Sequence, residues 1–465
     1  MRENRENSVE VEARAADAAA DAASAPKGRD AWASRTGFIL ACVGSAVGMA
    51  NIWLFPYRVA DLGGAAFLIP YLLFVALLGF SGVIGEMAFG RAMGAGPLGA
   101  FGKAMEMRGV AHGRVIGRVI GLVPTIGQLA LAVGYAVVLG WAVNYLVASL
   151  DGQLISTDQV SAFFGAVASE MGNVGFHLLG LGVTFAIMIL GISRGIERIN
   201  KVLMPAFFVL FVIVGIRVFM MPGAFEGYEY LLVPRWEALA NPTTWVYALG
   251  QAFFSLSLAG GGTLVYGSYL KKDVDVVRSA RDVAIFDTLA ALVAAFTVVP
   301  ALFAFGLDVS SGPPLLFITL PGVFQEMPLG NLFMIVFFLA VVFAAVTSLM
   351  NLFESPVEAL QDQFRLPRWA AVAVVAVIAV AVGLPLESGD AVSLWMDVIS
   401  IYVIPVGAFL AAVMFFWVCP RGFAKKQAEL GHGPIGRWFD VLTRYGFVGV
   451  TALVIVLGIF FGGIG

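Results

Sequence analysis

Two stretches of the sequence place glycine and small polar residues inside runs that are otherwise apolar. They read "GSAVGMANIWLFPYR" at 44–58 and "GQAFFSLSLAGGGTLVYGSY" at 250–269. At membrane depth, non-helical backbone is tolerated only where it is buried in protein or lines a cavity. We therefore predict a break at Gly48 and another across 260–262, with the freed amides and carbonyls directed toward a shared cavity.

Backbone groups freed in this way suit two kinds of ligand. The N-terminus of a half-helix presents N–H groups and a positive dipole end that favour a carboxylate, and freed carbonyls favour a hard cation such as sodium. The side chains of Asn51, Ser255 and Ser257 lie beside the predicted breaks and add oxygen donors. An alternative is that the glycines only allow close helix packing, but two such segments at matching positions favour a binding site.

The composition is that of a membrane protein with many spans. Of the 465 residues, 60% are hydrophobic and 13% are charged, and the mean hydropathy is +0.90. A span needs about 20 predominantly apolar residues. Eleven runs meet this need, at roughly 37–60, 64–89, 115–149, 175–193, 202–221, 243–270, 283–306, 330–361, 369–385, 393–419 and 446–464.

We predict an all-α integral membrane protein with about eleven transmembrane helices. The two interrupted segments begin consecutive sets of five spans, at about 37–221 and 243–419. Interrupted helices at corresponding positions of two halves are typical of secondary transporters with an inverted repeat. We expect one transmembrane domain at 29–465, whose extra helix at about 446–464 follows the repeats, and a disordered cytoplasmic tail at 1–28, which is polar and Ala-rich.

The basic residues predict the orientation, because Lys and Arg are enriched in cytoplasmic loops. With the N-terminus inside, 25 of the 28 Lys and Arg residues fall on the cytoplasmic side, and the exceptions are Arg58, Arg217 and Arg235. We therefore expect a multi-pass protein of the cell (inner) membrane. Its N-terminus would be cytoplasmic and, after an odd number of spans, its C-terminus extracellular or periplasmic.

The sequence does not point to an enzyme. It contains neither the GxxxxGK[ST] motif of ATP hydrolysis nor the HExxH motif of zinc proteases. Cys42 and Cys419 fall in different spans and make no disulfide framework, and His112, His177 and His432 share no metal-ligand spacing. Any transport would therefore be driven by an ion gradient.

Five segments carry a more specific signal. They are "GSAVGMANIWLFPYR", "GGAAFLIPY" (63–71), "GISRGIERINKVLMP" (191–205), "GQAFFSLSL" (250–258) and "AAVTSLMNL" (344–352). In this order they resemble the neurotransmitter:sodium symporter family, in its bacterial amino-acid branch, which includes tyrosine and tryptophan transporters. The likeness runs from about Arg29 to the end of the tenth span and implies a five-plus-five inverted-repeat fold with broken helices 1 and 6.

The resemblance implies two sodium sites made of oxygen donors, which a hard cation prefers. For Thr347 and Ser348 alone, helix-to-helix hydrogen bonding is the alternative explanation. The first site comprises the carbonyl of Ala46, the side chains of Asn51, Ser255 and Asp287, and the substrate carboxylate. The second comprises the carbonyls of Gly44, Val47 and Ala344 and the hydroxyls of Thr347 and Ser348.

Asp287 departs from the family pattern, in which an amide is common at this position. Chloride-dependent members bind the anion nearby among Tyr, Gln and Ser groups; Tyr71 and Gln251 match two of these, but Ala291 replaces the Ser. A carboxylate inside the membrane is expensive to keep and indicates function. We expect Asp287 to supply the negative charge that chloride supplies elsewhere, so no chloride is expected as a cofactor.

The resemblance also indicates the substrate. Amine transporters have Asp where this chain has Gly48, so the ligand should carry its own carboxylate, held by sodium, by the amides of Met49 and Ala50 and by Tyr135. We expect an amino acid and the lipid bilayer as partners, and no nucleic acid. The side-chain pocket would be lined by Leu131, Phe254, Ser257, Gly260, Ser348 and Leu352.

Gly260 occupies a position that holds Phe in a relative with a small aliphatic pocket. Its missing side chain would leave room for a larger ligand, which favours aromatic or large hydrophobic amino acids, tyrosine and tryptophan foremost. The alternative is that Gly260 only permits the helix break while a neighbouring residue fills the space.

Alternating access needs closures on both sides of the site. Inside, Arg29 and Asp362 match the family's cytoplasmic ion pair, with Trp32 and Tyr269 nearby, and Glu354 is an additional carboxylate to which the sequence assigns no role. The spacing from Gly195 to Pro205 is one that the family uses to unwind the fifth span, because proline cannot complete the helical hydrogen bonding.

Outside, the family's arginine is replaced by Leu54. Arg58 lies one turn further along the same helix face. We expect it to pair with Asp397; the alternative is a solvated arginine at the interface.

We therefore predict a sodium-coupled symporter that imports neutral, aromatic or large hydrophobic amino acids by alternating access, independently of chloride. A proton-coupled transporter of the same fold and a non-transporting ligand sensor or channel are the alternatives, since fold does not fix function.

Overall fold

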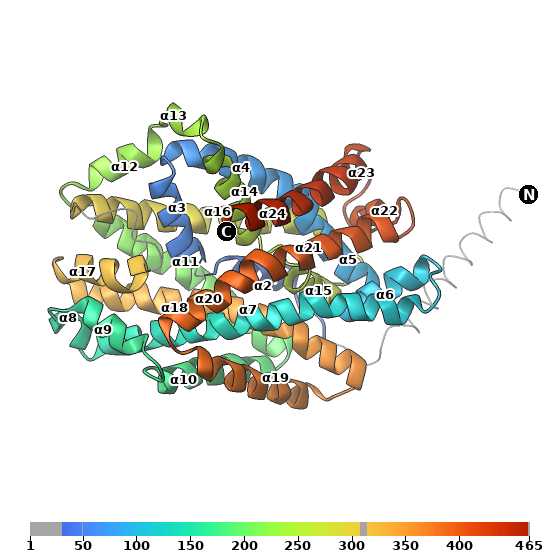
Figure 1. Cartoon of the computed structure of the whole chain (residues 1–465), viewed down its shortest axis with the longest axis horizontal. Helices are drawn as coiled ribbons and strands as arrows, with labels where there is room; N and C mark the ends of the chain where they lie inside the picture. Colours follow the sequence, from blue (N-terminus) through green and yellow to red (C-terminus); the bar gives the residue numbers. More distant parts are fainter. Residues whose placement is uncertain (1–29, 49, 307–313, 464–465) are drawn as a thin grey trace, which may run out of the picture.

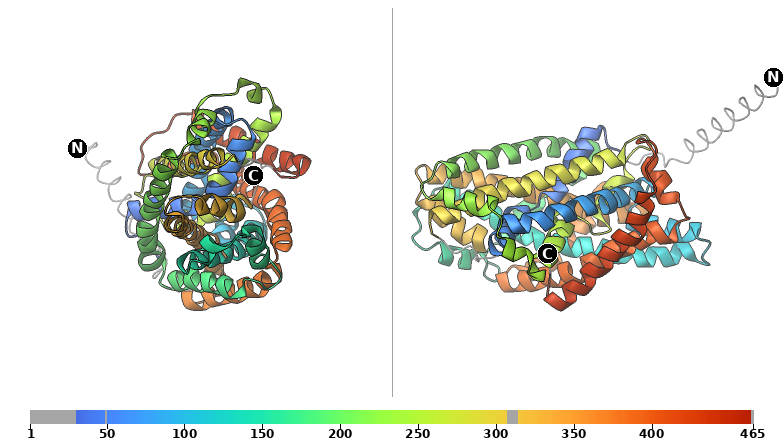
Figure 2. Two further views of the ribbon diagram at one scale, coloured as in Figure 1. Left: turned by 90° about the vertical axis from the view of Figure 1, so that its left-hand side faces the viewer. Right: turned by 90° about the horizontal axis from the view of Figure 1, so that it is seen from above.

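A computed structural model describes residues 30–48, 50–306 and 314–463, and every regular element in these ranges is helical. The long helices run along the longest axis of the molecule (Figure 1), and most of them are seen nearly end-on in the left view of Figure 2. The predicted tail at 1–28, the predicted gate residue Arg29 and the predicted ligand residue Met49 lie outside the described residues.

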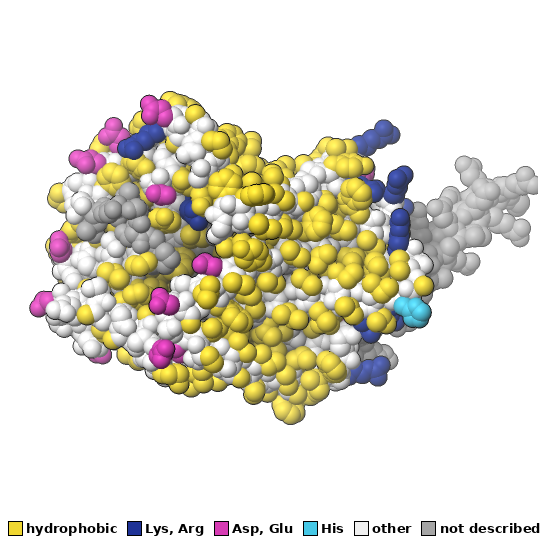
Figure 3. Space-filling model, viewed as in Figure 1, with side chains coloured by type: hydrophobic (Ala, Val, Ile, Leu, Met, Phe, Trp, Pro, Cys, Tyr) yellow, Lys and Arg dark blue, Asp and Glu magenta, His cyan; other side chains and the backbone are white. Residues whose placement is uncertain are grey.

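Charged side chains lie mainly at the two ends of the molecule. In the face drawn in Figure 3, a broad band of hydrophobic side chains separates an end with mostly acidic residues from an end where Lys and Arg gather. The basic end is the one where α6 (Pro97–Met107) and α22 (Phe423–Glu429) lie (Figure 1). A band of this kind is what the hydrocarbon core of a bilayer covers.

Within the described residues, eight continuous segments are long and apolar enough to cross a membrane. Three are single α-helices, α7 (Gly113–Leu150), α16 (Val276–Ala304) and α18 (Gly330–Phe364). The other five contain π or 3-10 turns: α4 to α5 (Ala65–Met93, with η2 at Gly79–Val83), η3 and α11 (Ile192–Phe219), α19 and η5 (Arg368–Leu386), α20 to η7 (Gly389–Val418) and α23 to α24 (Trp438–Phe461).

The remaining predicted spans are broken or short. The first comprises α2 (Arg35–Ala46), η1 (Ala50–Leu54) and α3 (Phe55–Asp61), and the sixth comprises α14 (Pro242–Ser255) and α15 (Gly262–Ser268). The fourth is α10 (Val174–Ile189). Shorter elements connect the spans: α8 (Gln153–Ser156), α9 (Val160–Val167), α12 (Ala224–Leu232), α13 (Trp236–Leu239), η4 (Leu315–Thr319) and α17 (Leu320–Gln325).

The predicted fold class is confirmed, and each of the eleven apolar runs corresponds to a helix or a broken pair. Several helices begin earlier than hydropathy alone predicts. The fifth starts at Ile192 instead of 202, the seventh at Val276 instead of 283 and the last at Trp438 instead of 446. For the seventh span the cause is an N-terminal cap, because the Asp275 side chain accepts from the amide of Arg278 at 2.9 Å.

The first predicted break lies where it was expected. α2 ends at Ala46, and the Gly48 amide donates to the Ala46 carbonyl at 2.8 Å instead of continuing the helical ladder. The helical pieces on either side of the break are bent by 60°.

The second break covers 256–261 and is wider than the three glycines alone. It contains two left-handed residues, Ser257 at φ +53° and Gly260 at φ +68°. Glycine adopts such angles without strain, whereas Ser257 requires support from its surroundings. Its hydroxyl donates to the Ser45 carbonyl at 3.1 Å, so the two breaks are hydrogen-bonded to each other.

Packing brings the two halves together around these breaks. α2 contacts α11, α16 and α18, while α14 packs on α4 and α15 on α5. The two broken helices are therefore enclosed by other helices, which is the condition under which irregular backbone persists at membrane depth.

Candidate functional site

A cavity of about 50 Å³ lies between the two breaks, α7 and α18. The sequence predicted eight of its lining residues: Ala46, Leu131, Tyr135, Phe254, Ser257, Ser348, Leu352 and, as the site of the first break, Gly48. Side chains that were not predicted also line it, among them Gln128, Asn351 and Ile404. Met49 is outside the described residues, and of Ala50 only the backbone is described.

Gly48 allows the Tyr135 hydroxyl to reach the first break. A Cβ atom at this position would collide with that hydroxyl and would lie 3.3 Å from the Ser348 hydroxyl. A side chain at position 48 would therefore have to displace the Tyr135 hydroxyl. Because Gly48 has no side chain, the Tyr135 hydroxyl lies next to the backbone groups freed by the first break. Such a set of donors suits the carboxylate of a ligand.

The predicted first sodium site is assembled as a tight cluster. Asn51 Nδ2 donates to Asp287 Oδ1 at 2.6 Å, and Ser255 Oγ lies 2.6 Å from Asp287 Oδ2 and 3.1 Å from Asn51 Oδ1. The Tyr71 hydroxyl lies 3.4 Å from Ser255 Oγ. All four side chains are buried. The cluster thus joins the first, second, sixth and seventh spans.

This donor set fits a sodium ion. Asp287 is fully buried, and no Lys, Arg or His among the described residues forms an ion pair with it. An isolated buried carboxylate is very unfavourable unless a cation or proton accompanies it. The carboxylate, amide and hydroxyl oxygens here are the ligand types that a hard cation prefers.

The predicted second sodium site lies where α2 meets α18. Thr347 Oγ1 lies 3.0 Å from the carbonyl oxygen of Gly44 and 2.9 Å from that of Ala344, so three of the predicted ligands are in contact. Ser348 Oγ donates to the Ser45 carbonyl at 3.2 Å. Ser45 was not predicted, although its carbonyl also accepts from Ser257.

Asn200 on α11 is a further residue at this second site that sequence reasoning missed. Its side chain is fully buried, Nδ2 donates to the Ile196 carbonyl at 2.8 Å, and Oδ1 has no hydrogen-bond partner within the described residues. Oδ1 packs directly against Gly44. A polar residue inside an apolar span was the available signal.

The structure corrects the prediction for Gly260. Gly260 is not among the residues that line the cavity, and a Cβ atom at this position would collide with the carbonyl of Gly407 on α21 (Ile404–Val413). The missing side chain therefore lets α21 approach the break and does not enlarge the pocket. Leu131, Phe254 and Ile404 supply the apolar lining instead.

Glu86 on α5 supports the same break and was also missed. Its Oε1 accepts from the Gly260 amide at 2.8 Å, and the side chain is buried. Breaking a helix leaves backbone donors without partners, and each buried unpaired donor costs about 1–3 kcal/mol. Glu86 satisfies one of them.

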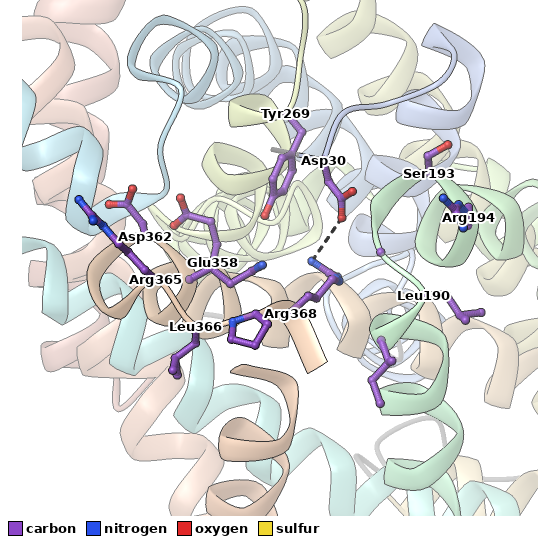
Figure 4. Close-up of a pocket in the computed structure, with 14 residues that line it drawn as sticks. Asp30, Leu190, Ser193, Arg194, Tyr269, Glu358, Asp362, Arg365, Leu366 and Arg368 are labelled. Carbon is purple, nitrogen blue, oxygen red and sulfur yellow. Dashed lines mark ion pairs between the residues drawn. The ribbon is translucent and has the colours of Figure 1, made fainter. Parts of the chain in front are cut away.

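Near Asp30, at the start of the first span, Glu354 forms an ion pair that the sequence did not predict. Arg368 contacts it through two parallel hydrogen bonds of 2.7 and 2.8 Å, and the Tyr269 hydroxyl donates to the same carboxylate at 2.8 Å. Figure 4 shows the surrounding cavity of about 870 Å³, in which Arg368 also lies 4.0 Å from Asp30. This cluster connects α15 of the broken sixth span to α18 and α19.

The predicted pair of Arg29 and Asp362 is not tested, because Arg29 lies outside the described residues. Asp362 lines the same cavity and accepts a hydrogen bond from Gln363 at 2.8 Å. Trp32 donates from its indole to the Tyr266 carbonyl at 2.9 Å, which ties the start of the first span to α15.

Removing the Arg368 charge should destabilise the protein strongly. Breaking a buried ion pair by deleting one partner typically costs about 3–5 kcal/mol, and Glu354 is fully buried. We expect Arg368→Met to lower the melting temperature in detergent far more than Arg365→Met, which changes an exposed arginine nearby. The double variant Glu354→Gln/Arg368→Met should recover much of the loss; equal effects at Arg365 and Arg368 would contradict this role.

The predicted pair of Arg58 and Asp397 is absent from the ion pairs of the described residues. The Arg58 guanidinium instead lies over the ring of Tyr247, 3.9 Å from its centroid. Arg58 and Asp397 both line a second cavity of about 550 Å³, and Tyr135 and Phe254 line both this cavity and the central one. Arg58 does not form the predicted pair because its guanidinium is held by a cation–π contact with Tyr247 on α14.

Two broken helices at matching positions and two buried oxygen clusters beside a central cavity define a secondary transporter of the inverted-repeat class. The family model described as the sodium:neurotransmitter symporter family matches residues 29–165 and 159–428. The chain belongs to this family of sodium-dependent transporters, as its motifs predicted.

Relatives and a solved structure agree with this assignment. An uncharacterized sodium-dependent transporter of Bacillus subtilis, YhdH, is 35% identical over 326 residues, or 70% of each chain. A second, MJ1319 of Methanocaldococcus jannaschii, is 30% identical over 460 residues, or 93% of this chain and 90% of the relative. The crystal structure of MhsT in complex with L-phenylalanine matches with a TM-score of 0.82 at 34% identity, covering 93% of this chain and 100% of MhsT.

Proposed function

We propose that this protein is a sodium-coupled symporter that imports neutral, preferably aromatic, amino acids across the cell membrane. The observation that carries the proposal is the fully buried Asp287, held by Asn51 and Ser255 next to the central cavity. A carboxylate in this position requires a cation when it is charged. The substrate carboxylate would complete the ligand set of that cation, which couples the two binding events.

Two sodium ions would be bound, one in each of the two oxygen clusters. The first would be bound at Asp287, Asn51, Ser255 and the Ala46 carbonyl, and the second at Thr347, Ser348 and the carbonyls of Gly44, Val47 and Ala344. The first cluster joins both broken helices to α16, and the second joins the first span to α18. Binding at both would therefore hold the first and sixth spans against α16 and α18. Transport would be independent of chloride because Asp287 already supplies the negative charge.

The substrate class follows from the cavity and from a relative. MhsT was solved with L-phenylalanine, and its chain is 34% identical to this one. Leu131, Phe254, Leu352 and Ile404 give the cavity an apolar lining, which suits a hydrophobic side chain. The Tyr135 hydroxyl beside Gly48 supports recognition of a carboxylate and hence of amino acids over amines.

Uptake into proteoliposomes tests the proposal. Labelled tyrosine should accumulate under an inward sodium gradient, and unlabelled tryptophan and phenylalanine should compete while tyramine, which lacks the carboxylate, should not. Replacing external sodium with potassium at fixed pH should abolish accumulation. Accumulation that persists without sodium but follows a pH gradient would indicate proton coupling, and binding without accumulation would indicate a sensor.

A further inference from the structure

Asn200 carries a buried oxygen atom beside the predicted second sodium site. The side chain is fully buried on α11, and its Nδ2 donates to the Ile196 carbonyl at 2.8 Å. This hydrogen bond determines which way the amide faces, because a carbonyl can only accept. Oδ1 is therefore the atom that packs against Gly44, and it has no hydrogen-bond partner within the described residues.

The space next to Gly44 contains more acceptors than donors. A Cβ atom at Gly44 would collide with Asn200 Oδ1 and would lie 3.2 Å from Thr347 Oγ1, so these two oxygens flank the same position. The Thr347 hydroxyl has one hydrogen but lies 2.9 to 3.0 Å from three carbonyl oxygens, one of which is that of Gly44. It can donate to only one of them at a time. A position rich in oxygen acceptors and poor in donors suits a hard cation.

The break in the first span adds to this excess of acceptors. In a continued helix the Gly48 amide would donate to the Gly44 carbonyl, but it donates to the Ala46 carbonyl instead. A buried acceptor that lacks a donor is unfavourable. None of the ligands predicted for the second site carries a charge, whereas the first site contains Asp287. A further amide oxygen would therefore contribute substantially to binding of a cation at the second site.

The packing of α11 fixes Asn200 relative to both sides of this site. Glu197, three residues earlier, accepts from the Ala33 amide at 2.7 Å and from the Ser34 hydroxyl at 2.8 Å, which ties this segment to the start of the first span. α11 also contacts α18, on which Thr347 lies. Oδ1 is thus held in position by helices on two sides.

Resting on the proposed function, we infer that Asn200 Oδ1 is a further ligand of the second sodium ion. The other predicted ligands come from the end of α2 and from α18, so Asn200 would add a third helix to the site. A bound ion would then hold α11 against the break of the first span as well as holding that break against α18.

The test measures sodium binding to the purified full-length protein, both by the sodium-induced rise in melting temperature and by binding of radioactive sodium. Threonine is the informative replacement at position 200. Its hydroxyl can still donate to the Ile196 carbonyl, four residues earlier on the helix, but its shorter side chain does not also present an oxygen to Gly44. We expect Asn200→Thr to raise the sodium concentration for half-maximal stabilisation about tenfold.

The matched control is Asn331→Thr. Asn331 lies on α18, about four turns before Thr347, and its Oδ1 is also buried without a hydrogen-bond partner among the described residues. This variant should leave the sodium affinity unchanged, because Asn331 is remote from both predicted ion sites.

Aspartate at position 200 provides an independent test. A buried carboxylate is very unfavourable unless a cation accompanies it. Asn200→Asp should therefore melt at a lower temperature than the unmodified protein in sodium-free buffer, and sodium should raise its melting temperature by more than it raises that of the unmodified protein.

Two outcomes would overturn the inference. The first is an unchanged sodium affinity in Asn200→Thr, as expected if Oδ1 only packs against Gly44. The second is a loss of stability in Asn200→Asp that is the same with and without sodium. Failure of the proposed function has a different signature, because sodium would then neither bind to the unmodified protein nor stabilise it.

Discussion

Asparagine in place of Asp287 is expected to lower sodium-driven uptake about 100-fold in chloride-free medium, a loss equivalent to ~2.7 kcal/mol. Asp287 is isosteric with asparagine, but its two oxygens accept from Asn51 and Ser255. An asparagine could keep both contacts only with its amide nitrogen toward Ser255, whose hydroxyl would then have to accept there and donate to Asn51 Oδ1 instead. The substitution also removes the negative charge on which the proposed first sodium site depends.

Chloride should partly rescue this variant. Gln251 is buried beside Ser255 with no hydrogen-bond partner for Nε2 among the described residues, and the Tyr71 hydroxyl lies next to Ser255. These donors could hold an anion once Asp287 is neutral. Uptake by the variant should therefore rise when chloride replaces gluconate, whereas uptake by the unmodified protein should not change.

The control for this prediction is Glu326→Gln, which neutralises an exposed carboxylate far from the cluster and should transport normally. Initial rates of tyrosine uptake, measured at matched protein content in the presence and absence of chloride, check both statements. A steep chloride requirement in the unmodified protein would refute the role of Asp287 as the fixed negative charge.

Alanine at Gly44 is expected to raise the sodium concentration for half-maximal uptake by roughly tenfold to 100-fold. The added methyl group would lie 2.9 Å from Thr347 Cβ and would collide with Asn200 Oδ1. Overpacking a tight site of this kind costs typically about 1–3 kcal/mol. Thr347 would move away from the Gly44 and Ala344 carbonyls, and the proposed second sodium site would lose its geometry.

A matched control is available on α10. A Cβ atom at Gly182 would have no neighbour within 4 Å among the described residues, so Gly182→Ala should leave the sodium dependence unchanged. Sodium titration of tyrosine uptake measures the effect on transport, and sodium-induced thermal stabilisation of the purified protein measures sodium binding independently of transport. Unchanged sodium affinity in Gly44→Ala would exclude a role for this glycine in the ion site.

Sequence reasoning succeeded where a property is local to a segment. Mean hydropathy and length predicted the spans, because a bilayer imposes them on each helix separately. The glycines and small polar residues predicted both breaks, since backbone conformation depends chiefly on the residues at the break. Asn51, Ser255 and Asp287 meet as the family resemblance implied.

The errors concern side chains whose partners come from distant segments. Gly260 faces the carbonyl of Gly407, and Arg58 lies over Tyr247. Glu354 pairs with Arg368, although the sequence assigned it no role. In each case the residue type could be read from the sequence, but the neighbours that the residue faces in the folded protein could not be predicted from it.

The sequence by itself determined that this is a polytopic membrane protein with two broken helices and oxygen donors beside them. It also determined that the chain belongs to a family of sodium-dependent transporters. Only the tertiary structure decided which residues line the cavity and which partners satisfy the buried charges. The physical reason is that side-chain direction around an irregular backbone depends on its torsion angles and on how neighbouring helices pack against it. Gln128 and Asn351 illustrate this dependence, because they lie 223 positions apart in the sequence and the packing of α7 against α18 brings both to the lining of the central cavity.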